Sequence, residues 1–205
     1  MTLTLGDVQE TAFIPVAIKA NESLRKNARI KDDIAVKIVQ HLDIDTSKFD
    51  KFLSHEGVIA RTLMLDRMVK NFIAENPNTV IVNIGAGFDN RFSRVDNGTI
   101  SWIDLDLPDS IIARQKVFAE HERVTMLSGS VLNDNWCTAV KEKIPQTNAK
   151  VLFLAEGLFM YLTLEEISKV LSILKVIKGE FSKWNTDCRT EQSSYGQKSE
   201  ISRHC

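Results

Sequence analysis

The stretch that decides the fold is TVIVNIGAGFDNRFSRVDNGTISWIDLDLP, residues 79–108. Its β-branched run over residues 80–84 predicts a strand that is buried on both faces of a sheet. Gly85 and Gly87 follow this run. Glycines at the end of a strand predict a tight turn whose backbone can come close to a ligand. A second apolar run over residues 100–103 predicts a neighbouring parallel strand.

Two acids, Asp104 and Asp106, come directly after this second run. A glycine turn after one parallel strand and an acid after the next form an arrangement that binds nucleosides. Backbone amides face the polar ligand, and the acid accepts hydrogen bonds from ribose hydroxyls. The alternative reading is that the two glycines only turn the chain from a strand into a helix.

Two cofactors use such an arrangement, a nicotinamide dinucleotide and S-adenosylmethionine. The dinucleotide fingerprint has a small residue at its sixth position, where this chain has Asn90. Asp89 would place a negative charge near a pyrophosphate, whereas S-adenosylmethionine carries a cationic sulfonium and an ammonium group. Gly85, Gly87 and Asp89 together therefore favour S-adenosylmethionine, and a nicotinamide oxidoreductase is the disfavoured alternative.

Composition and charge exclude several classes of protein. The chain has 205 residues, enough for one domain with a core, and a net charge of -1, which offers no basic field to nucleic acid or to an anionic membrane. Neither a signal peptide nor a run of ~18 apolar residues that could span a membrane is apparent. The three cysteines are widely separated and lack a Cys-x-x-Cys pattern. We expect a cytoplasmic protein without a metal ion, and the oligomeric state stays open.

The hydrophobic periodicity predicts three helices before the glycine turn and an alternation of strands and helices after it. The N-terminal helices are expected over residues 11–30, 31–42 and 54–75. Later helices are expected over residues 108–118 and 136–143 and after a capping box at residues 163–166, and later strands over residues 124–127 and 151–155. This order predicts a parallel α/β sheet with an N-terminal helical cap.

Several segments of the chain resemble the leucine carboxyl methyltransferase-like family, which includes polyketide O-methyltransferases. They are TAFIP with the following Lys19 and Ala20, DDIA at residues 32–35, Arg61-Thr62 with Asp66 ahead of NIGAGFDNRF at residues 83–92, DLDLP at residues 104–108, and AEGLFMYL at residues 155–162. The resemblance covers residues 11–178. It implies a class I methyltransferase with a Rossmann-like sheet, which moves a methyl group from S-adenosylmethionine to a carboxylate or acidic hydroxyl of a small molecule or peptide.

The resemblance also implies roles around the cofactor. Gly85 and Gly87 would lie against its methionine part and its sugar, and Asp104 or Asp106 would bind the ribose. These roles agree with the interpretation of the glycine turn and the two acids as a nucleoside-binding arrangement.

Four further cofactor contacts follow from the resemblance. Arg61 would hold the carboxylate, Glu156 would lie near the amino group and the reacting centre, and Val131 and Leu132 would flank the adenine. By spacing alone, Arg61 lies at the margin of an apolar stripe, where a cation either extends to solvent or pairs with an acid. Glu156 has an alternative role as a charge partner of the next helix N-terminus.

Two residues, Lys19 and Tyr161, would face the methyl acceptor according to the resemblance. The alternative reading of Tyr161 is an aromatic side chain of the core. No histidine lies in the matched segments, so no catalytic base is named, which favours an acceptor that is already ionised.

The family's sheet has seven strands, but residues 179–205 contain few large apolar side chains and no strand pattern. Such a composition predicts disorder. We expect a methyltransferase domain over residues 1–178, divided into a cap (1–76) and a Rossmann-like core (77–178), that is truncated after the fourth strand and followed by a polar tail (179–205). The alternative function is a truncated, catalytically inactive fragment that at most binds the cofactor.

Overall fold

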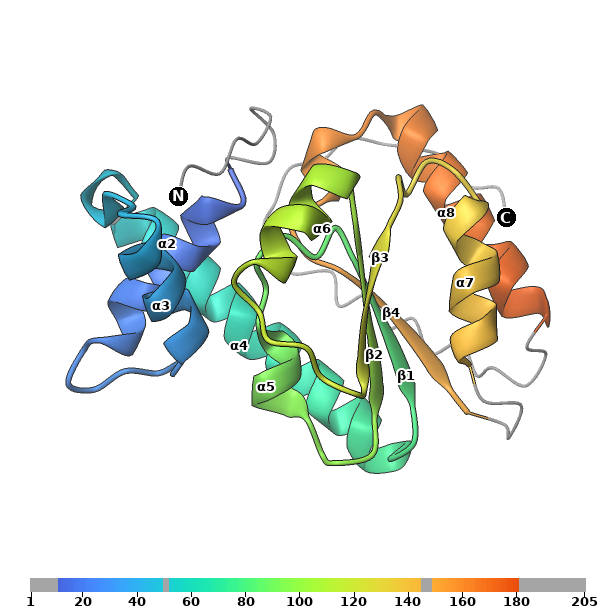
Figure 1. Ribbon diagram of the computed structural model, residues 1–205, viewed down its shortest axis with the longest axis horizontal. Coiled ribbons are helices and arrows are strands. Elements are labelled where there is room, and N and C mark those ends of the chain that lie inside the picture. Colours follow the sequence, from blue (N-terminus) through green and yellow to red (C-terminus); the bar gives the residue numbers. More distant parts are fainter. Residues whose placement is uncertain (1–10, 50–51, 145–148, 181–205) are drawn as a thin grey trace, which may run out of the picture.

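The computed structural model describes residues 11–49, 52–144 and 149–180. Within this part of the chain, four parallel strands form a sheet in the order β3-β2-β1-β4 (Figure 1). The strands are β1 (Val80–Ile84), β2 (Ser101–Asp106), β3 (Val124–Ser128) and β4 (Val151–Ala155). The helices are α2 (Phe13–Ser23), α3 (Asp33–His41), α4 (Phe52–Glu75), α5 (Arg91–Val95), α6 (Pro108–Gln115), α7 (Asn135–Lys143) and α8 (Leu164–Glu180), with 3-10 turns η1 (Thr46–Lys48) and η2 (Phe159–Tyr161).

Strand β1 is one of the two inner strands of the described sheet, and its five residues are all buried. Val80 lies opposite Ser101 of β2 on one side and opposite Val151 of β4 on the other. Because all three strands run in the same direction, their carboxyl ends meet at one edge of the sheet. The segments that follow β1, β2 and β4 therefore come together in space, as the sequence predicted for the first two.

Helices cover both faces of the sheet. On one face, α4 and α5 pack against it through Val69, Ile73 and Val95 (Figure 1). On the other face, α7 and α8 pack through Val140 and Val170. The predicted fold, a Rossmann-like parallel α/β sheet with an N-terminal helical cap, is confirmed. No helix in residues 11–49, 52–144 and 149–180 is long and apolar enough to cross a membrane.

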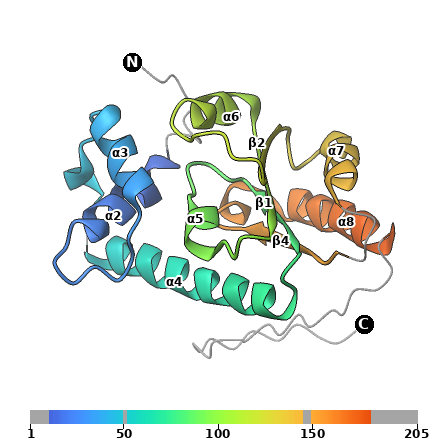
Figure 2. The same cartoon turned by 60° about the horizontal axis from the view of Figure 1, so that its bottom comes forward.

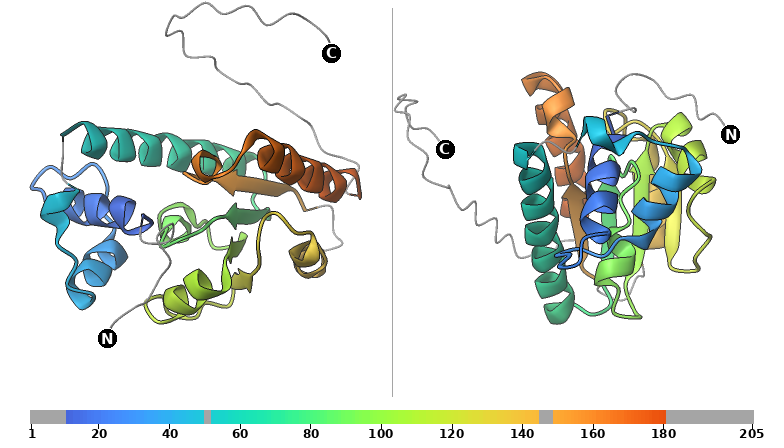
Figure 3. Two further views of the ribbon diagram at one scale, coloured as in Figure 1. Left: turned by 90° about the horizontal axis from the view of Figure 1, so that it is seen from above. Right: turned by 90° about the vertical axis from the view of Figure 1, so that its left-hand side faces the viewer.

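Of the expected cap over residues 1–76, α2, α3 and η1 lie beside the core, away from α7 and α8 (Figure 3), and we keep the name cap for these three elements. Helix α4 joins the two parts, because it runs from the cap along the sheet (Figure 2). Ile59, near its start, is buried with Ile18 of α2, and Ile73, near its end, is buried with Ile81 of β1.

Some boundaries differ from those expected. Strand β2 continues to Asp106 rather than ending at residue 103, so Asp104 lies inside the strand. Helix α2 starts at Phe13, two residues before Pro15. A proline is tolerated there because the N–H groups of a first turn have no intrahelical acceptor. Helix α2 ends at Ser23 and not at residue 30.

The predicted capping box is present at the start of α8. The backbone N–H of Glu166 donates to Oγ1 of Thr163 at 3.2 Å, and the N–H of Thr163 donates to Oε2 of Glu166 at 2.8 Å. Helix α8 continues to Glu180, so the expected boundary at residue 178 falls inside it. The rest of the expected tail lies outside the described residues.

A buried carboxylate ties the cap to α4. The carboxylate of Glu22 in α2 accepts hydrogen bonds from the backbone N–H of Arg29 at 2.8 Å and from its Nε at 3.0 Å, and it lies 2.9 Å from Nε2 of His55 in α4. The hydrogen bond from the Arg29 side chain lowers the pKa of Glu22 to about 2, from an ordinary value of 4.5. The pKa of Glu22 is lower in the folded protein than in the unfolded chain. Ionised Glu22 therefore stabilises the fold at pH values above 4.5, and this contribution is lost as the pH falls toward 2.

We therefore expect Glu22→Gln to lower the free energy of unfolding at neutral pH, and the difference from the wild type to shrink as the pH falls below 4.5. Urea denaturation from neutral pH down to about pH 3 measures this difference. Glu120→Gln, at an exposed position before β3, is the control and should change stability little. A loss in Glu22→Gln that stays constant or grows toward acid pH would contradict this role of Glu22.

Candidate functional site

A cavity of about 470 Å³ lies where the carboxyl ends of β1, β2 and β4 meet the cap. Its volume is within the range of ~300–1,000 Å³ that is usual for small-molecule sites. Ten of the eleven residues assigned from the sequence line it, namely Lys19, Arg61, Gly85, Gly87, Asp89, Asp106, Val131, Leu132, Glu156 and Tyr161. The exception is Asp104. The fold thus brings together segments that are far apart in the sequence.

The turn after β1 has a backbone that requires glycine. Gly85 has φ +67° and Gly87 has φ +46°, a region that side chains with a Cβ rarely adopt. A Cβ on Gly85 would lie 3.1 Å from Cδ1 of Leu158. The N–H of Gly87 donates to Oδ2 of Asp106 at 2.7 Å, so the turn is tethered to the end of β2.

The two acids of β2 have different roles. Asp104 is fully buried, and burial raises the pKa of its carboxyl group. Its oxygens accept hydrogen bonds from Asn83, Trp102 and Arg114. Arg114 also donates to the backbone oxygens of Gly87 at 2.9 Å and Asp89 at 2.7 Å. Of the two acids expected to bind the ribose, Asp106 lines the cavity, whereas Asp104 is buried beneath it with its three hydrogen-bond donors, so the ribose contact stays a prediction for Asp106.

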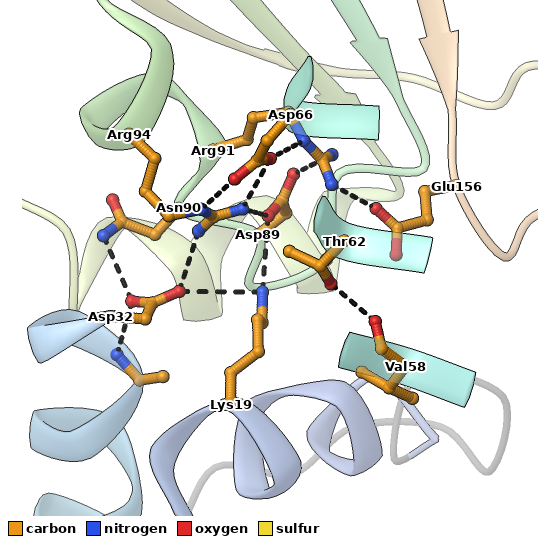
Figure 4. Close-up of polar contacts among 12 residues, drawn as sticks. Lys19, Asp32, Val58, Thr62, Asp66, Asp89, Asn90, Arg91, Arg94 and Glu156 are labelled. Atoms are coloured by element: carbon orange, nitrogen blue, oxygen red, sulfur yellow. Dashed lines mark hydrogen bonds and ion pairs between the residues drawn. The ribbon is translucent and has the colours of Figure 1, made fainter. Parts of the chain in front are cut away.

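Four carboxylates and four basic side chains form a cluster beside the cavity. Figure 4 shows most of these side chains. We call it the ion-pair cluster. Its acids are Asp32, Asp66, Asp89 and Glu156, and its bases are Lys19, Arg61, Arg91 and Arg94. They come from α2, the N-cap of α3, α4, the segment after β1 and the segment after β4. The cluster therefore joins the cap to the core at the cavity.

Arg91 is the centre of the ion-pair cluster, and its side chain is fully buried. Its Nε donates to Oδ1 of Asp66 at 2.6 Å, its Nη1 to Oδ2 of Asp89 at 2.7 Å, and its Nη2 to Oε2 of Glu156 at 2.5 Å. One guanidinium group thus fixes three carboxylates from three different segments.

Asp89 lies on the cavity wall and is surrounded by cations. Burial alone would raise the pKa of its carboxyl group, but Arg91, Lys19, Arg94 and Arg114 outweigh burial and hold the pKa well below its usual range. Nζ of Lys19 lies 3.3 Å from Asp89. Asp89 is therefore a permanent negative charge beside the glycine turn.

Arg61 and Glu156 form an ion pair in the cavity wall. Nε of Arg61 donates to Oε1 of Glu156 at 2.8 Å, and Arg91 donates to the other oxygen, Oε2. The side chain of Arg61 is 37% exposed and that of Glu156 is 13% exposed. The alternative for Arg61, pairing with an acid, is thus observed, and both partners still line the cavity.

The remaining predicted residues lie on other parts of the wall. Tyr161 is 45% exposed, and its hydroxyl lies 2.7 Å from Oγ1 of Thr11 in the segment before α2. The alternative reading of Tyr161 as a core aromatic is therefore wrong. Val131 and Leu132 line the cavity from the loop after β3 and supply apolar surface.

Arg91 and Arg114 are almost completely buried, and neither had an expected role. One signal was available. Asp66, Asp89 and Glu156 lie in segments that the resemblance places together, and buried carboxylates require cations nearby. The arginines directly after the glycine turn were the natural candidates.

Comparisons with known proteins agree with this arrangement. The model of the leucine carboxyl methyltransferase family matches residues 12–175. The chain is 28% identical over 163 residues to the tetracenomycin polyketide synthesis O-methyltransferase TcmP of Streptomyces glaucescens, covering 78% of this chain and 58% of that protein. It is 26% identical over 197 residues to the S-adenosyl-L-methionine-dependent methyltransferase dpfgK of Gibberella zeae, covering 87% of this chain and 63% of that protein.

The chain thus spans about three fifths of the length of these curated relatives. A solved structure of human N-acetylserotonin methyltransferase in complex with S-adenosylmethionine matches at 10% identity and a TM-score of 0.37, over 84% of this chain and 47% of that one. We draw no conclusion about this chain from so remote a similarity. The family match covers most of the chain and agrees with the expected cofactor, S-adenosylmethionine, which dpfgK uses by name. The chain belongs to the leucine carboxyl methyltransferase family.

Proposed function

We propose that this chain moves a methyl group from S-adenosylmethionine to an ionised oxygen, a carboxylate or an acidic hydroxyl, of a small molecule or peptide. The observation that carries the proposal is the Arg61–Glu156 ion pair beside the turn of Gly85 and Gly87. A cation and an anion side by side complement the carboxylate and ammonium of an amino acid.

The rest of the cavity wall suits the other parts of the cofactor. Asp106 offers an acid for ribose hydroxyls, and Val131 and Leu132 offer apolar surface for adenine. Because Gly85 and Gly87 have no side chain, the backbone of the turn itself lines the cavity. S-adenosylmethionine supplies a methyl group on a sulfonium, which is already activated toward an oxygen nucleophile.

The charges of the cavity favour an acceptor that needs no general base. Among the residues that line the cavity in the described part of the chain, no histidine or cysteine is present. Each lining carboxylate is engaged, Asp89 and Glu156 by cations and Asp106 by the N–H groups of Gly87 and Leu107. A carboxylate is ionised at neutral pH without help, whereas an ordinary phenol, with a pKa near ~10, is not.

We assign the acceptor contacts to Lys19 and Tyr161. Lys19 reaches the cavity from α2 and Tyr161 from η2, and a cation suits an anionic acceptor. The protein's contribution to rate would then be orientation of the acceptor oxygen, which is worth up to ~7–11 kcal/mol in favourable cases. TcmP is by name an O-methyltransferase, which supports oxygen as the acceptor atom.

The proposal predicts a particular order of acceptors. With methyl-labelled S-adenosylmethionine at neutral pH, an aryl carboxylate and a phenol acidified by a nitro group should be methylated, and the corresponding phenol without the nitro group should not. Faster methylation of the unsubstituted phenol would contradict the proposed acceptor class. If S-adenosylhomocysteine binds by calorimetry while no acceptor of a broad panel is methylated, the alternative of an inactive fragment that only binds the cofactor is the correct one.

A second prediction concerns the glycine turn. Gly87→Val should abolish binding of S-adenosylhomocysteine, because the side chain would project at the cavity wall and a Cβ there already lies 3.3 Å from Ala12 Cβ. Gly98→Val is the matched control, since Gly98 has φ +88°, nothing within 4 Å of its Cβ position and no place in the cavity. Both variants should lose stability in thermal melts, but only Gly87→Val should lose binding. Equal affinities in the two variants would show that the glycines only turn the chain.

A further inference from the structure

We propose that Arg91 is a positioning residue for the cofactor's amino-acid part, which it controls by holding Glu156. This inference rests on the proposed role of Glu156 in cofactor binding. Arg91 does not line the cavity and its side chain is fully buried, so we assign it no direct contact with the ligand. It donates to Glu156 at 2.5 Å, and Glu156 does line the cavity.

Charge neutralisation alone does not explain why a buried arginine is present at position 91. Each of its three acids has a second basic partner: Arg61 for Glu156, Arg94 for Asp66, and Lys19 for Asp89. Without Arg91, none of these carboxylates would be left without a cation. What Arg91 adds is geometry, because its planar guanidinium fixes the angles between its donors, which lysine does not.

Glu156 depends on Arg91 more than on Arg61 for its position. The side chain of Arg91 is 0% exposed and is fixed by hydrogen bonds to Asp66 and Asp89 as well. The side chain of Arg61 is 37% exposed, and Glu156 is its hydrogen-bond partner within the ion-pair cluster. Removing Arg91 therefore leaves Glu156 attached to the more exposed of its two partners.

Arg94 provides a matched comparison within the same helix. It lies one turn after Arg91 in α5, its side chain is only 10% exposed, and it holds Asp66 at 2.7 Å and Asp32 at 2.9 Å. Its bonds within the ion-pair cluster go to Asp32, Asp66 and Asp89, not to Glu156. Arg94, like Arg91, is absent from the cavity wall. Loss of Arg94 would remove a buried guanidinium group from the ion-pair cluster without removing a hydrogen bond to Glu156.

The two halves of the cofactor allow a direct test with the full chain. S-adenosylhomocysteine carries the amino-acid part, whereas 5′-methylthioadenosine keeps the nucleoside and lacks it. Calorimetry of both ligands is compared for the wild type, Arg91→Met, Arg94→Met, Glu156→Gln and the Arg91→Met/Glu156→Gln double variant. Thermal melts in parallel report the stability of each variant.

We expect Arg91→Met to weaken S-adenosylhomocysteine by about 10- to 100-fold, the range of a charged hydrogen bond, and to leave 5′-methylthioadenosine nearly unchanged. Arg94→Met should lower stability and keep the wild-type ratio of the two affinities. The double variant should bind S-adenosylhomocysteine no more weakly than Glu156→Gln does, because both changes remove one contribution. Arg91→Lys, which keeps the charge and loses the planar fork, should shift the ratio in the same direction and serves where Arg91→Met does not fold.

Two results would overturn the inference while the proposed function stands. In one, the wild type binds S-adenosylhomocysteine and the Arg91 variants weaken both ligands equally, which is the behaviour of a purely structural residue. In the other, the losses in the double variant add fully, which means that Arg91 does not act through Glu156. Failure of the wild type to bind S-adenosylhomocysteine would instead contradict the proposed function itself.

Discussion

The pairing of buried acids with buried guanidinium groups is the constraint on which the rest of this structure depends. Removing charges from water costs several kcal/mol per ion unless each charge finds partners with good geometry. In the ion-pair cluster Asp89 meets Lys19, Arg91 and Arg94, and Glu156 meets Arg61 and Arg91. These basic partners come from α2 of the cap, from α4 and from α5. The wall of the cavity next to the cap is therefore fixed by charge as well as by apolar packing.

This arrangement connects the fold to the site. The buried run of β1 places the glycine turn at the centre of the sheet edge, between the ends of β2 and β4. Asp106 tethers the turn from β2, and Arg114 holds two of its backbone oxygens. Arg91, two residues after Asp89, links the turn to Glu156 beyond β4. With Val131 and Leu132 after β3, all four strands of the described sheet thus contribute to one cavity, each through the residues at or just beyond its end.

The sequence predicted those features that depend on local patterns. The β-branched run, the glycine turn and the capping box were confirmed because each is encoded within a few adjacent residues. The end of β2 was misplaced, because Asp104 looks polar in the sequence but is buried with its hydrogen-bond donors Asn83, Trp102 and Arg114. Helix α5 has five residues, too few to show a helical period. The three acids that Arg91 holds lie up to 65 residues away in the sequence, so no local pattern reveals these ion pairs, and only the family resemblance places their segments together.

The central claim is that the cofactor binds against the glycine turn, and the amide signals of glycine report on this directly. In a chain labelled with 15N only at glycine, titration with S-adenosylhomocysteine should shift the amide signals of glycines that line the cavity, namely Gly85, Gly87, Gly129 and Gly157. Gly57, in α4, and Gly98, before β2, do not line it, and their signals should stay in place. Saturable binding that moves Gly57 or Gly98 while the signals of Gly85 and Gly87 remain unchanged would contradict the account.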